Sequence, residues 1–151
     1  MVQRFYLYFP LRFAPESVRI PLVFTYIGFD HIALVTKHVP AMKKFYVEGL
    51  GLAVESEWKS KAGYAVTTLR IGDSVLDLFE ASPTNPAPMA NLSEEHFCLR
   101  ATGSSIYDVI ATLKRKGLEP TQAEVNNGAA GKGLSTFVRD PDGNKIEIKV
   151  D

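Results

Sequence analysis

Two histidines of this chain stand in short segments that match one another. The segment DHIAL contains His31 and the segment EHFCL contains His96, so each histidine follows an acidic residue. Two carboxylates stand in a second matching pair, Asp77 in VLDLF and Glu147 in KIEIK. Two imidazoles with one or two carboxylates suit a divalent ion such as zinc, nickel, manganese, iron or cobalt. His31, Asp77, His96 and Glu147 are therefore the candidate metal ligands.

Each candidate ligand lies in a stretch that is typical of a β-strand, where residues two apart share a face. Apolar Ile146 and Ile148 flank Glu147, which places the carboxylate on the face opposite the core. Ile32 takes the core side next to His31, and the same alternation surrounds the other two candidates. We therefore expect all four side chains on the same kind of sheet face.

Taken singly, these residues have plainer interpretations. Glu147 lies between two lysines, as a surface charge would, and a single strand histidine is more often structural than a ligand. Matched placement favours ligands, because two of the three histidines occupy equivalent positions whereas His38 falls in a loop. Asp77 is left open between ligand and ordinary polar residue.

A cysteine and a glycine-rich loop could each have a chemical role or an ordinary structural one. Cys98 follows His96 by two residues, but free cysteines usually behave as small buried hydrophobes, and we expect that here rather than a nucleophile. The loop NNGAAGKG, residues 126–133, lacks the Ser or Thr and the helix context of a phosphate-binding loop. We expect a mobile loop over the cavity, of the kind that gates a substrate.

The chain also repeats a pattern of elements. Each half predicts the order βαβββ, and the proline-rich linker Ala81–Asn91 joins the halves. The expected fold is α+β, with two tandem modules that form a curved, barrel-like mixed sheet around a metal cavity. The expected strands and helices cover residues 29–36, 40–49, 52–58, 64–71, 74–80, 94–101, 105–116 with Ser104 as N-cap, 118–124, 134–139 and 145–150.

The composition narrows the classes of partner that the protein is expected to bind. The 151 residues carry 17 basic and 17 acidic side chains, which favours a small-molecule partner over nucleic acid or a membrane surface. One cysteine fits a reducing compartment, so we expect a cytoplasmic protein. Residues 1–27 read as an N-terminal extension with no assigned function, and residues 28–151 as the domain.

The motifs together resemble the vicinal oxygen chelate superfamily, which includes glyoxalase I, fosfomycin-resistance thiol transferases, extradiol dioxygenases and bleomycin-resistance proteins. The matching segments are DHIALVT, FYVEGLGL, IGDSVLDLFE, EEHFCLR and FVRDPDGNKIEI. The resemblance implies one divalent metal ion, held by His31, Asp77, His96 and Glu147, with proton transfer by Glu147. It also implies a homodimer whose cavities are completed by strands from both chains.

The resemblance leaves the reaction open. Asp77 replaces the longer Glu of glyoxalase I, so a three-ligand His, His, Glu site is an alternative, and Val35 and Ala81 replace an Arg and an Asn of that enzyme. We expect a metal-dependent, glyoxalase-like lyase or isomerase acting on a small oxygenated substrate, including thiol adducts. The alternatives are a fosfomycin-type thiol transferase, an extradiol dioxygenase and a metal-free, drug-sequestering bleomycin-resistance-type binder with Trp58, Tyr64 and Phe79 lining its groove.

Overall fold

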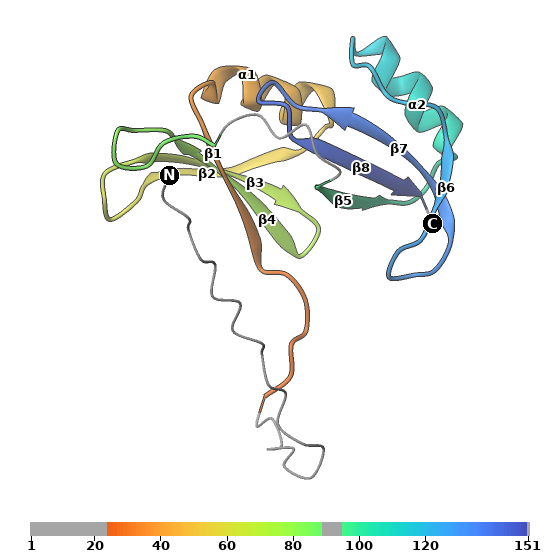
Figure 1. Cartoon of the computed structure of the whole chain (residues 1–151), viewed down its shortest axis with the longest axis horizontal. Helices are drawn as coiled ribbons and strands as arrows, with labels where there is room; N and C mark the ends of the chain where they lie inside the picture. The colour runs from red at the N-terminus through yellow and green to blue at the C-terminus, as the bar shows by residue number, and fades with distance from the viewer. Residues whose placement is uncertain (1–23, 89–94, 151) are drawn as a thin grey trace, which may run out of the picture.

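The chain forms two four-stranded sheets that lie side by side (Figure 1). The computed structural model describes residues 24–88 and 95–150, so most of the predicted extension lies outside the described residues. The predicted α+β fold of two βαβββ modules is confirmed, and the sheets curve without closing into a barrel.

Both sheets have the same strand order and the same mixture of directions. The strands of the first sheet run in the order β1-β4-β3-β2, those of the second in the order β5-β8-β7-β6, and each sheet has one parallel pair. This equivalence confirms the internal repeat. The strands are β1 (His31–Thr36), β2 (Ala53–Lys59), β3 (Ala65–Ile71), β4 (Ser74–Glu80), β5 (His96–Ala101), β6 (Glu124–Asn126), β7 (Gly133–Arg139) and β8 (Lys145–Val150).

Helices cover one face of the strands in each module. Helix α1 (Val39–Lys43) continues as a π-helical segment, η1 (Lys44–Gly49), and α2 is Ile106–Arg115. The N-cap of α2 is Ser105, not Ser104 as predicted, because the Ser105 hydroxyl accepts the backbone N–H of Asp108. None of the helices within the two described ranges has the length and apolarity to cross a bilayer.

The sixth strand is shorter and later than the sequence predicts. The prediction for residues 118–124 is wrong, since β6 has three residues and begins at Glu124. Pro120 supplies no backbone N–H. Thr121 donates its N–H to the Phe137 carbonyl at 2.9 Å, but the Phe137 N–H goes to the Thr121 hydroxyl instead of to a backbone carbonyl. The chain therefore approaches β7 before it forms a regular ladder.

One hydrophobic core joins the two modules. It lies between the helices and the sheet faces turned toward them, which confirms the predicted core side of β1, β4 and β8. The opposite face of each sheet is called its open face below. The buried core residues are Met42, Phe45, Tyr46, Leu69, Leu76, Leu78, Leu113, Val138, Ile146 and Ile148.

A buried polar contact also ties the modules together. The hydroxyl of Tyr46 in η1 donates to Asp140 Oδ2, at the turn before β8, over 2.9 Å. Asp140 also accepts the backbone N–H groups of Asp142 and Asn144 and the Asn144 side-chain amide, so its carboxylate is fully used. The FYVEGLGL and DPDGN motifs therefore meet at this contact.

Candidate metal site

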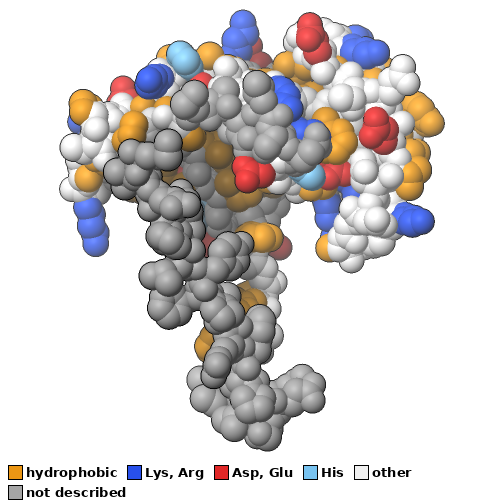
Figure 2. All heavy atoms as spheres, viewed as in Figure 1, with side chains coloured by type: hydrophobic (Ala, Val, Ile, Leu, Met, Phe, Trp, Pro, Cys, Tyr) orange, Lys and Arg blue, Asp and Glu red, His pale blue; other side chains and the backbone are white. Residues whose placement is uncertain are grey.

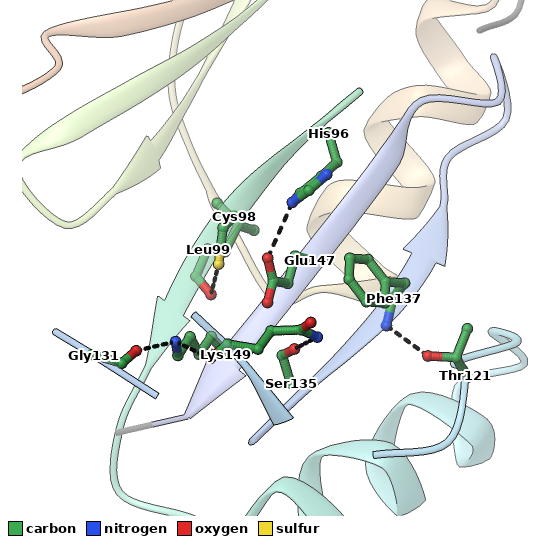
Figure 3. A network of polar contacts seen from close by, with 10 residues as sticks. His96, Cys98, Leu99, Thr121, Gly131, Ser135, Phe137, Glu147 and Lys149 are labelled. Atoms are coloured by element: carbon green, nitrogen blue, oxygen red, sulfur yellow. Dashed lines mark hydrogen bonds and ion pairs between the residues drawn. The ribbon is translucent and has the colours of Figure 1, made fainter. Parts of the chain in front are cut away.

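The second module brings two candidate ligands into contact. His96 Nε2 lies 3.1 Å from Glu147 Oε2 on the open face of the second sheet (Figure 3). The parallel pairing of β5 with β8 causes this, because it sets Cys98 opposite Glu147 and places His96 two residues before Cys98, on the same face. The Phe137 ring stands edge-on to the His96 ring, with 5.5 Å between centroids.

Glu147 is only 4% exposed, so its interpretation as a surface charge is wrong. Because β8 is an inner strand, Glu147 has a neighbouring side chain on each side of it on this face, Cys98 of β5 and Phe137 of β7. Within the described part of the chain, Glu147 Oε1 has no hydrogen-bond partner. A buried, unpaired carboxylate oxygen costs roughly 1–3 kcal/mol, a cost that a bound cation would remove.

The first module places its two candidates on the matching face without a direct contact. The pairing of Ala33 with Asp77 sets His31 on the same face as Asp77. His31 is exposed, and its hydrogen bond to the Asp30 carboxylate raises the pKa of its imidazole. The Asp77 carboxylate is 8% exposed and accepts the Thr68 hydroxyl at 2.6 Å.

Thr68 is a site residue that the sequence reasoning missed. Its oxygen accepts the Trp58 indole N–H at 3.0 Å, so its hydroxyl proton is directed at Asp77. Trp58 also stands edge-on to Phe79, with ring centroids 6.1 Å apart. The hydroxyl of the third predicted groove aromatic, Tyr64, contacts Thr84 instead. No feature of the sequence signals the polar chain, because it depends on the β2–β3–β4 register.

The two pairs of candidates do not form a single cluster. Across residues 24–88 and 95–150, no three His, Cys, Asp or Glu side chains gather in a way that could hold a metal ion. The structure therefore brings His96 to Glu147 and sets His31 and Asp77 on a common sheet face. It does not join the pairs within one chain.

Cys98 differs from the expectation of a buried side chain. The residue is exposed on the open face beside Glu147. Partial desolvation of the sulfur and the neighbouring carboxylate raise the pKa of the Cys98 thiol to about 11. It is therefore almost entirely protonated at neutral pH, which agrees with the expectation that it is not a nucleophile.

Charges of both signs are mixed over the face of the molecule in Figure 2, in keeping with the balanced composition. This pattern is unlike the basic stripe of a nucleic-acid-binding surface.

The chain is similar to proteins of varied description. It is 27% identical over 121 residues to "Virulence protein STM3117" of Salmonella typhimurium (79% of this chain, 81% of that one). It is 31% identical over 125 residues to "Biphenyl-2,3-diol 1,2-dioxygenase 3" of Rhodococcus globerulus, covering 80% of this chain and 62% of that enzyme.

Among solved structures, a glyoxalase family protein from Enterococcus faecalis has a TM-score of 0.61 and 28% identity, over 82% of this chain and 98% of that one. The family model described as Glyoxalase/Bleomycin resistance protein/Dioxygenase superfamily matches residues 28–148. The chain belongs to this superfamily.

Proposed function

We propose that the protein is a metal-dependent, glyoxalase-like lyase or isomerase acting on a small oxygenated substrate, including thiol adducts. The observation that carries this is the Glu147 carboxylate, which is buried beside His96 with one oxygen unpaired among the described residues. The unpaired oxygen adds no stability by itself. It is suited to a cation, and imidazole with carboxylate is a common donor pair for divalent metals.

In this proposal His31, His96 and Glu147 hold one divalent ion, and Asp77 is a fourth ligand. Zinc, nickel, manganese, iron or cobalt would suit this donor set. Since no three of these groups meet within the described chain, the set requires a second copy. We propose a homodimer in which the open face of the first sheet meets the open face of the partner's second sheet.

A metal ion bound there would polarise two neighbouring substrate oxygens as a Lewis acid. The protein's own contribution is proton transfer and orientation. Glu147 would be the catalytic residue, accepting a substrate proton at its carboxylate. The Thr68 hydroxyl donates to Asp77 Oδ1 and so orients that carboxylate, whose oxygens keep lone pairs for coordination.

Metal titration of the full chain tests this proposal. EDTA-stripped protein is titrated calorimetrically with zinc, nickel and manganese, and we expect tight binding of one ion per chain. His31→Ala and His96→Ala should weaken binding at least about a hundredfold, the usual scale for losing a ligand or its support. His38→Ala is the matched control, because this histidine pairs with Asp142 away from the open faces. Equal binding by all three variants, or none by wild type, contradicts the proposal.

A dioxygenase activity is the second candidate. The 31% identity to a biphenyl-2,3-diol dioxygenase favours it. The hydrogen bond that Asp77 accepts from Thr68 also favours it, because this bond competes with a metal for the Asp77 carboxylate and so favours a His, His, Glu set. Oxygen-electrode assays of the iron(II)-loaded protein with catechol and biphenyl-2,3-diol distinguish it from the lyase. Oxygen uptake supports the dioxygenase, and its absence alongside hemithioacetal isomerisation supports the lyase.

A metal-free binding function is supported by one observation. Trp58 is 43% exposed and stands beside Phe79 on the open face. Calorimetry with bleomycin and EDTA-stripped protein tests it, and binding that is unchanged by added metal would favour this function over the enzyme.

A further inference from the structure

The glycine-rich loop between β6 and β7 is fastened to β8 by a buried lysine. Lys149 is 4% exposed, and its Nζ donates to the backbone carbonyls of Asn126 at 2.8 Å and Gly131 at 2.7 Å (Figure 3). The sequence predicts this lysine as a charge on the face opposite the core and the loop as mobile. Instead, the ammonium group lies between the two ends of the loop.

Two glycines leave the space that the lysine needs. A Cβ on Gly128 would lie 2.8 Å from Lys149 Nζ, and a Cβ on Gly133 would lie 2.8 Å from its Cε. Neither contact is compatible with the observed position of the side chain. Glycine at these two positions is therefore explained by the passage of Lys149, without any requirement for a phosphate ligand.

The loop is also closed on itself and on the sheet. Gly128 and Gly131 exchange backbone hydrogen bonds of 3.0 and 2.9 Å. The Asn126 amide donates to the Ser135 hydroxyl at 2.8 Å, on the strand that pairs with β8. The carbonyl of Gly131 thus serves both the turn and the lysine, so loss of the lysine should loosen the turn.

We propose that Lys149 is a positioning residue. Its ammonium binds two backbone carbonyls of the loop and so fixes residues 127–132 at the end of the candidate metal face. Lys149 shares that face with Glu147, two residues away on β8. The fastened loop therefore sets one boundary of the space next to the Glu147 carboxylate. This inference concerns the loop and stands whether or not the protein binds a metal.

Hydrogen exchange of the Gly128 and Gly131 amides tests the proposal directly. In Lys149→Met we expect both amides to exchange at least about tenfold faster, since two charge-assisted hydrogen bonds are lost. Trypsin cleavage after Lys132, an exposed residue of the loop, should accelerate by a similar factor. The control is Lys145→Met, which removes another lysine from the same face of β8. The Nζ of Lys145 lies 4.3 Å from the centroid of the Phe137 ring.

Two further variants keep the test decisive. Gly128→Ala retains the Lys149 ammonium but places a methyl group where that ammonium lies. It should therefore expose the same two amides to exchange even if Lys149→Met fails to fold. In Lys149→Ala, n-propylammonium replaces the missing atoms and should restore slow exchange, whereas n-propanol should not. Exchange within twofold of wild type in Lys149→Met or Gly128→Ala would overturn the proposal, as would equal rescue by n-propanol.

Discussion

Replacing Glu147 by leucine should leave the metal-free protein at least as stable as wild type. Glu147 and Asp140 are both buried carboxylates, exposed by 4% and 5%, but their partners differ. Asp140 accepts four donors, whereas Glu147 contacts His96 Nε2 through Oε2, lies beside the Cys98 thiol, and has no hydrogen-bond partner at Oε1 in the described structure. Removing the Asp140 carboxylate, which the fold uses, should therefore lower the free energy of unfolding. Removing the Glu147 carboxylate, which is available to a ligand, should not.

The magnitude follows from the two sets of contacts. Glu147→Leu relieves the unpaired oxygen, worth roughly 1–3 kcal/mol. It loses the contact with His96, whose side chain is 34% exposed, so that pair is screened and contributes about 1 kcal/mol at most. The net expectation is a gain of about 1 kcal/mol. Asp140→Asn should instead cost about 3 kcal/mol, because an amide cannot accept four donors.

Urea denaturation of EDTA-stripped protein measures both changes, followed by the fluorescence of Trp58, the only tryptophan, and by circular dichroism. The expected order of unfolding free energy is Glu147→Leu at or above wild type and Asp140→Asn far below it. If Glu147→Leu loses more than about 1 kcal/mol, the carboxylate supports the fold and the reasoning behind the metal site is wrong.

Measurements at three other residues test the interpretation of the polar contacts. Tyr46→Phe should cost about 1.5 kcal/mol in the same assay, because Asp140 loses one of four donors, while Tyr107→Phe on the exposed face of α2 should change stability by less than about 0.5 kcal/mol. Burial and the Asp140 carboxylate raise the pKa of Tyr46 above its value in the unfolded chain. Above about pH 10 the tyrosine therefore ionises in the unfolded chain first, which stabilises that state. The stability advantage of wild type over Tyr46→Phe should therefore shrink as pH rises through that range. Thr68→Val should cost about 1.5 kcal/mol by leaving Asp77 without its donor, and Thr68→Ser should recover most of it; equal loss in both would assign the effect to packing. Iodoacetamide should alkylate Cys98 at a rate that keeps rising toward pH 11, and a plateau near pH 9 would contradict the raised thiol pKa.

Alternation and turn residues were enough to predict most of the architecture. The predicted strand at residues 74–80 coincides with β4, because the Gly72-Asp73 turn marks its start and a proline-rich segment follows it. The core side of β8 was also predictable from Ile146 and Ile148. These features are local, and local patterns are visible in a sequence.

The features that could not be predicted from the sequence depend on contacts between distant segments. The burial of Glu147 and Lys149 could not be predicted, since charged residues that alternate with apolar ones are typical of a solvent-facing side. On that face Glu147 lies between Cys98 and Phe137 of the neighbouring strands, and Lys149 is held by backbone carbonyls of Asn126 and Gly131. The separation of the two candidate pairs likewise follows from how the modules pack, which the repeat does not reveal.

Mixing two defective variants tests the central claim most directly, namely that one metal site uses His31 of one copy and His96 of another. His31→Ala and His96→Ala are titrated with zinc separately and again after being unfolded and refolded together. Half of the refolded dimers should be mixed, and each should hold one intact site, so tight binding should return to roughly a quarter of the sites. No recovery, with wild-type protein binding zinc tightly, would contradict a site shared between two chains.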